Sequence, residues 1–319
     1  MTLSICIPTY NRSIFLPTTV NSIIDSINFS QAENVELIIS DNASTDDTPT
    51  VIENLIKRYP FIKSYRNEKN VMDENFFIAA KLATGKYVWV FADDDLMELE
   101  AVATVLKATV NDFNLIILNY SIWDQYIKSK LLDSRYVMKD DLELYNCNEV
   151  LSKFSMGPQF ISAIIVKRDK FLSINKYDYR KLHQFGNSFL YAVYCSIKED
   201  CKTLYLSKHY LKYRGFNSDL TTIDKWYKYF VYGNNFLLML LKQEGYKTHA
   251  IRNARKKIIT YYLARDIVAR KKNNQNTLIL LKKIPAIFYT HLSYCAICLP
   301  IIFLPNSVFK FLYSFKNAK

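Results

Sequence analysis

The first hundred residues alternate between short apolar runs and longer stretches in which apolar residues recur every three or four positions. The short runs are rich in β-branched and aromatic residues and predict strands, whereas the longer stretches have the spacing of amphipathic helices. This alternation predicts βαβ units and an α/β fold with a mainly parallel sheet flanked by helices. The strands are predicted at 3–7, 35–40, 62–65 and 88–91, and the helices at 16–27, 49–59 and 74–83.

The strand predicted at 88–91 leads into three consecutive aspartates, Asp93, Asp94 and Asp95. Ligands of open α/β sheets bind at the carboxyl ends of the strands. Adjacent carboxylates repel one another and are costly to hold together unless a cation lies between them. Oxygen ligands suit Mg²⁺ or Mn²⁺, which proteins often bind together with substrate phosphates. The pattern indicates a metal–diphosphate site, and an acidic loop or helix N-terminus is the alternative.

Two further polar loops, at 9–12 and 41–47, follow the first and second predicted strands. In a doubly wound sheet, both would emerge at the same edge as the aspartates. Taken singly, Asp41 and Asn42 fit turn formers, and Asp46 or Asp47 fits a helix cap. The coincidence of three polar loops at one edge favours a binding site.

Three segments then carry a resemblance: residues 4–12, 38–48 and 85–96 occur in an order and spacing that resembles the nucleotide-sugar half of the family 2 glycosyltransferases. The resemblance is strong over residues 3–110 and thin beyond them. It implies a Rossmann-like GT-A domain over residues 1–220. It also implies an inverting enzyme that moves a sugar from a nucleotide-diphosphate sugar to a hydroxyl of a glycan acceptor. The reaction would be a single displacement without a covalent enzyme intermediate, as in bacterial O-antigen or capsule synthesis.

The resemblance implies roles for individual residues by position. Thr9 and Tyr10 would flank the nucleotide base, and Asp41 would accept a hydrogen bond from it. Asp94 would lie near the ribose or the sugar. Arg66 and Arg214 are candidates for contacts with the phosphates. The donor-binding residues would be Pro8, Thr9, Tyr10, Arg12, Asp41, Asn42, Asn70, Asp93 and Asp94, and the ligands of Mn²⁺ or Mg²⁺ would be Asp95 and Asp93.

The catalytic base is the point at which the sequence departs from the family pattern. The family usually supplies an acid roughly 90–100 residues after the aspartate motif. This chain has no acid between Lys181 and Lys198. His183 is the leading candidate because imidazole titrates near neutrality, and Asp178 is the second. A structural hydrogen bond is the alternative role for His183, and a protein without a base would bind nucleotide sugars without catalysis.

The charge is divided unevenly along the chain. Residues 1–200 contain 21 Lys and Arg against 26 Asp and Glu, whereas residues 201–319 contain 21 against 4. Helical spacing predicts helices at 224–244 and 249–272, and the second is basic and amphipathic. The apolar run at 294–304 that follows is shorter than the roughly 20 residues that a bilayer span requires. Residues 221–319 are therefore expected to form a helical region that lies at a membrane interface, which suits a lipid-linked acceptor.

Other readings of the basic region remain open. It also fits a helical subdomain packed on the catalytic domain, or a non-catalytic nucleic-acid-binding protein with steep salt dependence. The adjacent apolar run favours lipid, so no nucleic-acid partner is expected. A nucleotidyltransferase is disfavoured because no Gly-rich, basic loop follows the first strand. The N-terminus enters a strand directly without a secretory signal, so a cytoplasmic location at the inner face of the membrane is expected.

Overall fold

The computed structural model describes residues 1–174, 181–215 and 223–317, which fold into two compact units. The first, here called the sheet unit, comprises Met1–Val150, Gly157–Gln184 and Ser188–Asp219. The second, the helical unit, comprises Leu151–Met156, Phe185–Asn187 and Leu220–Lys319. The two short segments join the helical unit although they precede the boundary predicted at residue 220.

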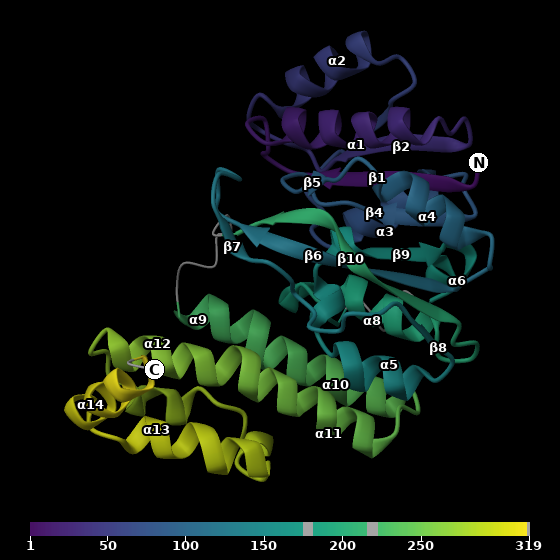
Figure 1. The fold of residues 1–319 in the computed structure, drawn as a ribbon. Coiled ribbons are helices and arrows are strands. Elements are labelled where there is room, and N and C mark those ends of the chain that lie inside the picture. Colours follow the sequence, from purple (N-terminus) through teal and green to yellow (C-terminus); the bar gives the residue numbers. More distant parts are fainter. Residues whose placement is uncertain (175–180, 216–222, 318–319) are drawn as a thin grey trace. The chain divides into compact units, whose positions relative to one another are not determined.

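The sheet unit is built on one sheet, which has ten strands among the described residues (Figure 1). The strand order is β3-β2-β1-β4-β9-β6-β10-β5, with β7 paired to β6 and β8 paired to β10. The strands are β1 (Leu3–Thr9), β2 (Val35–Asp41), β3 (Lys63–Arg66), β4 (Tyr87–Val90), β5 (Leu96–Met97), β6 (Leu115–Trp123), β7 (Lys130–Leu132), β8 (Leu142–Leu144), β9 (Ile164–Lys167) and β10 (Thr203–Arg214).

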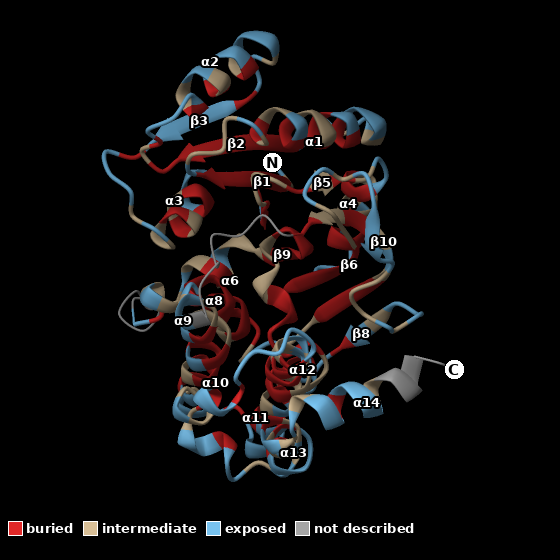
Figure 2. Ribbon diagram, turned by 90° about the vertical axis from the view of Figure 1, so that its left-hand side faces the viewer, coloured by how far each residue is buried: buried red, intermediate tan, exposed pale blue. Residues whose placement is uncertain are grey.

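The strands of the first hundred residues form the parallel half of the sheet. β1 pairs in parallel with β2 and β4, and β2 pairs in parallel with β3. Every residue of β1, β2 and β4 is buried, and β1 and β2 are red along their length in Figure 2. Burial on both faces explains why these strands are apolar runs without alternation. The predicted βαβ order is confirmed.

The end of β1 was predicted wrongly, because the strand continues through Pro8 and Thr9 instead of ending before Pro8. Phe91 N donates to Cys6 O, and Asn42 N donates to Thr9 O. Successive residues of β1 thus face β4 and β2 in turn, and Pro8 faces the side on which β4 has already ended at Val90. Its missing N–H therefore removes no ladder hydrogen bond.

The later strands make the sheet mixed. β9 lies between β4 and β6 and is antiparallel to both, whereas β10 runs parallel to β6. The short strand β5, which follows the aspartates directly, pairs in antiparallel fashion with β10. The α/β class is confirmed, and the antiparallel pairs come from the part of the chain beyond the βαβ alternation.

Helices cover both faces of the parallel strands. α1 packs against α4 and α2 on one side, and on the other side α3 packs on β1, β2 and β4 and also contacts α6 and α8. The five apolar residues that predicted the first helix are all buried in α1. The helices of this part of the chain are α1 (Leu16–Ser30), α2 (Thr48–Arg58), α3 (Glu74–Leu82), α4 (Ala101–Thr109), α5 (Cys147–Phe154), α6 (Arg168–Leu172) and α8 (Ser188–Ser196).

The helical unit contains the two long helices that the sequence predicts, each interrupted by a π-helical segment. Ile251, Ile258, Ile259, Leu263 and Ile267 of the basic helix are buried, so its apolar face packs inside the unit. The elements are α9 (Ile223–Trp226), η4 (Tyr227–Gly233), α10 (Asn234–Gln243), α11 (Thr248–Lys257), η5 (Ile258–Leu263), α12 (Ala264–Lys272), η6 (Leu278–Lys282), η7 (Ala286–Phe288), η8 (Tyr294–Cys298), α13 (Leu299–Phe303) and α14 (Asn306–Asn317).

Candidate active site

The polar loops after β1 and β2 are tied together at the carboxyl edge of the sheet. Asn11 N donates to Ser44 Oγ over 2.9 Å, and Arg12 N donates to Thr48 Oγ1 over 2.9 Å. Asn11 itself has a φ of 54°, which turns the first loop back toward the second. Backbone amides of one loop thus bind hydroxyls of the other, which fixes both loops beside the aspartates that follow β4.

These loops line a cavity of about 600 Å³ within the sheet unit. It brings together most of the donor-binding residues that the sequence singled out. Asp41, Asp94 and Asp95 are not among the described residues that line it. The lining residues are Pro8, Thr9, Tyr10, Asn11, Arg12, Asn42, Asn70, Met72, Asp73, Asn75, Phe76 and Asp93.

Asp41, at the end of β2, is buried and already holds two protein groups. Its Oδ1 accepts a hydrogen bond from Ser44 N over 3.0 Å, and its Oδ2 forms an ion pair with Arg66. Arg66 also donates to Ser44 O over 2.8 Å. Arg66, a candidate phosphate contact from the sequence, therefore fixes Asp41 and the second loop in this structure.

A network of asparagines forms one wall of the cavity. Asn67 donates to the side-chain oxygens of Asn42 and Asn75, and Asn42 donates to Asn70 Oδ1 over 2.9 Å. Asn75 is itself anchored to β2, since its Nδ2 donates to Ser40 O over 2.8 Å. Asn67 was missed by the sequence reasoning, and the repeated asparagines between 67 and 75 were the available signal.

Asp95 is completely buried, and both of its carboxylate oxygens accept hydrogen bonds from the protein. Ser162 Oγ donates to Oδ2 over 2.7 Å, and Arg214 N donates to Oδ1 over 3.0 Å. Burial and the neighbouring charge of Asp94 raise the pKa of Asp95 well above its usual range. The sequence predicted Asp95 as a direct metal ligand. That role stays a prediction: in this structure the carboxylate accepts these two hydrogen bonds and holds the aspartate loop.

Asp93 is the aspartate that lines the cavity. Arg12 Nε lies 3.4 Å from its Oδ1, and Thr19 Oγ1 donates to its carbonyl over 3.1 Å. Burial and then the charge of Asp94 raise the pKa of Asp93 to about 7, against the opposing effect of Arg12. Burial and the neighbouring carboxylate of Asp94 disfavour the ionised form of Asp93. A cation bound beside Asp93 would stabilise that form.

Two residues that organise the aspartate loop were not assigned this role from the sequence. Ser162 Oγ accepts a hydrogen bond from Ala92 N over 2.9 Å while it donates to Asp95. Arg214 Nε donates to Asp94 O over 2.6 Å. The Arg214 guanidinium also lies 4.9 Å from the centre of the Phe15 ring. Arg214, a candidate phosphate contact from the sequence, is thus held against the loop itself.

Neither residue suggested as the base is among the described residues that line the cavity. His183 begins the short 3-10 helix η3 (His183–Phe185), just before α8, and is not among the described residues that line the cavity. Asp178 falls outside the described residues.

The residues around Asp93 offer oxygen ligands to a divalent cation. The described residues contain no group of three or more His, Cys, Asp or Glu that is placed to hold a metal ion. Asp93 lines the cavity and Asp94 follows it in the chain, and one or two carboxylates suit Mg²⁺ or Mn²⁺ when substrate phosphates complete the shell. These residues fit the expected ion.

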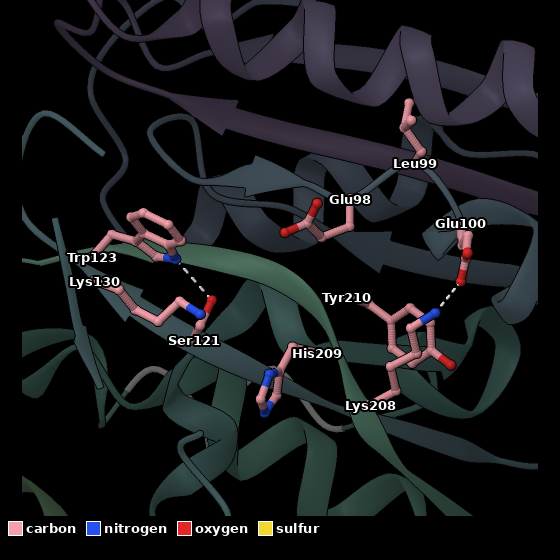
Figure 3. Close-up of a pocket in the computed structure, with 9 residues that line it drawn as sticks. All are labelled: Glu98, Leu99, Glu100, Ser121, Trp123, Lys130, Lys208, His209 and Tyr210. Atoms are coloured by element: carbon pink, nitrogen blue, oxygen red, sulfur yellow. Dashed lines mark hydrogen bonds and ion pairs between the residues drawn. The ribbon is translucent and has the colours of Figure 1, made fainter. Parts of the chain in front are cut away.

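A second cavity, of about 470 Å³, lies over β10 and the segment after β5 (Figure 3). It includes Trp123, one of the aromatic residues in the polar middle segment of the sequence. Lys130 and Lys212 both lie 5.5 Å from the centre of the Trp123 ring, and Trp123 Nε1 donates to Ser121 Oγ. The charges around it are paired as well, since Glu100 bonds to Lys208. The Trp123 ring therefore already contacts the ammonium groups of Lys130 and Lys212.

Comparison with known proteins agrees with the fold and the motifs. Residues 4–161 match the model of glycosyl transferase family 2, and this part of the chain belongs to that family. Abequosyltransferase RfbV of Salmonella typhimurium is 31% identical over 186 residues, which are 55% of this chain and 55% of that protein. The GalNAc(5)-diNAcBac-PP-undecaprenol beta-1,3-glucosyltransferase of Campylobacter jejuni is 25% identical over 226 residues, 69% of this chain and 67% of that protein.

Solved structures show the same fold. The structure of S. aureus TarS residues 1–349 in complex with UDP-GlcNAc superposes with a TM-score of 0.59 at 13% identity and covers 91% of this chain and 78% of that chain. The longer TarS structure also gives a TM-score of 0.59, and the match spans half of its length. The GT-A fold expected from the sequence is confirmed.

Proposed function

We propose that this protein is a glycosyltransferase that moves a sugar from a nucleotide-diphosphate sugar to a hydroxyl of a lipid-linked glycan in the synthesis of a cell-surface polysaccharide. The observation that carries the proposal is the cavity at the carboxyl ends of β1, β2 and β4. It combines aromatic rings, amides, a cation and two carboxylates. The names of the relatives, an abequosyltransferase and an undecaprenol-linked glucosyltransferase, support the reaction class and the lipid-linked acceptor.

The cavity residues suit the parts of such a donor. The Tyr10 ring is 40% exposed and offers a face on which a nucleotide base can stack. Asn42 and Asn70 offer oxygens and amides to the base and the ribose. Arg12 brings a positive charge to the place where a diphosphate would meet Asp93.

We assign Asp93 and Asp94 as the residues that would hold Mn²⁺ or Mg²⁺ at this site. Asp95 would fix their loop from behind through Ser162 and Arg214. When bound, the ion would stabilise the negative charge that develops on the departing diphosphate. Arg12 would balance part of the same charge and hold the donor in place.

We further propose that the helical unit attaches the protein to the cytoplasmic face of the inner membrane. No single helix among the described residues is long and apolar enough to cross a bilayer. One bent pair, Tyr294–Phe303 with Asn306–Tyr313 at 116°, meets that test only together. This region exposes large apolar side chains beside basic residues, which suits an interfacial contact with anionic lipid. They include Leu278, Ile287, Leu292, Phe303, Phe311 and Leu312.

A transfer assay tests the proposed reaction. Radiolabelled UDP-, GDP-, CDP- and dTDP-sugars would be incubated with the protein, Mn²⁺ and bacterial membranes that carry undecaprenol-linked saccharides. The proposal predicts that one donor labels the extractable lipid fraction and that Asp93→Asn lowers this labelling by at least about 100-fold. Nucleotide binding without transfer from any donor would instead support the non-catalytic binding protein that the missing acid at 182–198 allows.

A further inference from the structure

We propose that Asp73 is the general base of this site and accepts the proton of the attacking acceptor hydroxyl. The inference rests on the proposed transferase function and names a residue that the sequence analysis did not single out. It is drawn from three observations: the position of Asp73 in the cavity wall, its contact with α8, and the absence of an acid in the segment where the family resemblance implies one.

Asp73 stands in the wall of the donor cavity. It lines the cavity together with Met72 and Phe76, while Arg12 and Asp93 line it from the loops after β1 and β4. A carboxylate in this wall shares one enclosed space with the residues proposed to hold the diphosphate. The reacting carbon of the sugar is bonded to that diphosphate, so it must lie in or beside the same space.

The side chain of Asp73 reaches the segment that lacks an acid of its own. Its Oδ2 accepts a hydrogen bond over 3.4 Å from Ser188 N, the first amide of α8. The rings of Phe76 and Phe189 meet edge to face with their centres 5.8 Å apart. The beginnings of α3 and α8 are therefore packed together, and Asp73 brings a carboxylate to residues 182–198, where the sequence has none.

The Asp73 carboxylate does not cap its own helix in the described structure. Asp73 occupies the N-cap position of α3, where aspartate commonly accepts a hydrogen bond from an amide of its own helix. The described structure shows no such capping bond, and the carboxylate points to α8 instead. A side chain that only capped α3 would be expected to point to the first amides of α3.

The protonation behaviour of Asp73 fits a base. Burial raises its pKa to about 6, although hydrogen bonds from Ser188 oppose the shift. Such a carboxylate is ionised at neutral pH yet basic enough to take a proton. The charged and titratable groups on the surrounding elements are Glu74 of α3, Arg12 and Asp93 across the cavity, and His183 before α8.

The acceptor hydroxyl loses its proton to a carboxylate oxygen of Asp73 as its oxygen forms a bond to C1 of the sugar. The bond between C1 and the diphosphate oxygen breaks at the same time, and its electron pair leaves with the nucleoside diphosphate. The products are the glycosidic ether, the nucleoside diphosphate and a protonated Asp73, which returns its proton to solvent.

The test compares Asp73→Asn and Asp73→Glu with wild type, and Glu74→Gln serves as the control. Glu74 is the neighbouring acid and does not line the cavity. Nucleotide diphosphate binding is measured by calorimetry, and transfer is measured with the donor that wild type uses best. Asp73→Asn is expected to lower kcat by about 10²–10⁴-fold while the nucleotide Kd changes by less than about threefold. Glu74→Gln is expected to keep wild-type kcat.

The pH profile gives a second readout. Wild-type kcat is expected to rise with pH through an apparent pKa of about 6, because the ionised carboxylate is the active form. Asp73→Asn is expected to lose this limb, and Asp73→Glu to recover part of kcat with the limb present.

The outcomes that overturn the assignment are distinct from failure of the proposed function. Wild-type kcat in Asp73→Asn, or loss of kcat in His183→Ala while Asp73→Asn stays active, would overturn Asp73 as the base and leave the transferase standing. Absence of nucleotide binding by folded wild-type protein would overturn the transferase itself. A weakened nucleotide Kd with unchanged kcat would make Asp73 a binding residue and also overturn the assignment.

Discussion

Three consecutive aspartates with the same chemistry have different surroundings in this protein. Asp95 is buried with a donor on each oxygen, and Asp93 faces the cavity beside Arg12. Asp94 contributes the like charge that raises the pKa values of both neighbours. The role of each carboxylate therefore follows from the groups that hold it, which lie far away in the sequence.

This difference predicts that Asp95→Asn mainly lowers stability and that Asp93→Asn mainly weakens nucleotide binding. Asp95→Asn is expected to lower the free energy of unfolding by about 1–3 kcal/mol, because an amide nitrogen replaces an oxygen that accepts a buried hydrogen bond. Asp93→Asn is expected to leave stability near wild type, since it removes a like charge beside Asp94, and to weaken Mn²⁺-dependent nucleotide binding. Urea denaturation and calorimetry measure the two effects. Equal loss of stability in both variants would contradict the assigned roles.

At the scale of elements, the strand inserted between the two halves of the sheet supports the site. β9 pairs in antiparallel fashion with β4 and β6, and the 3-10 turn before it, η2 (Ile161–Ala163), contains Ser162. Ser162 O accepts a hydrogen bond from Trp89 Nε1 over 2.7 Å, and its hydroxyl joins Ala92 N to Asp95. This turn holds the end of β4 and the aspartate loop in one geometry.

Removing the Ser162 hydroxyl is expected to destabilise the protein. In Ser162→Ala, Ala92 N loses its acceptor and Asp95 loses a donor, at a cost of about 2–3 kcal/mol. The control is Ser196→Ala in α8, a buried serine whose hydroxyl donates to Val193 O of its own helix. That variant is expected to stay within about 0.5 kcal/mol of wild type. A loss in Ser162→Ala no larger than in the control would refute the bridging role.

The sequence predicted the parallel strands, their helices and the cavity loops, because those features depend on local periodicity and on strand order. It could not place β9, whose partners come from earlier strands, nor show that Ser162 would meet Asp95. The contact between Asp73 and Ser188 joins positions 115 residues apart and has no local signature. For the same reason, the sequence could not show that Ser162 and Arg214 donate to the two oxygens of Asp95.

At the scale of the molecule, the sheet unit and the helical unit carry different kinds of surface. The sheet unit contains the donor cavity with its carboxylates and amides, whereas the helical unit contains most of the basic second part of the chain. Within the helical unit the apolar face of the basic helix is already buried. A contact with the membrane interface must therefore use the exposed apolar residues of the segments that follow the basic helix.

Vesicle flotation tests this contact. The protein is expected to float with vesicles rich in anionic lipid and to be released as salt rises, because the Debye length shortens. Leu292→Gln with Phe311→Gln is expected to reduce binding by about tenfold or more, since these side chains are 82% and 62% exposed. Val110→Gln with Val137→Gln, which replaces side chains exposed in the sheet unit, is the control. Equal binding by both double variants would contradict attachment through the helical unit.

Calorimetry with UDP, GDP, CDP and dTDP tests whether a metal-dependent nucleotide-sugar site lies between Tyr10 and Asp93. Each would be titrated into wild type and Asp93→Asn, with and without Mn²⁺. Wild type is expected to bind one of these nucleotides with Mn²⁺ and to lose most of that affinity without the ion or in Asp93→Asn. A folded wild-type protein that binds none of the four would contradict the proposed site.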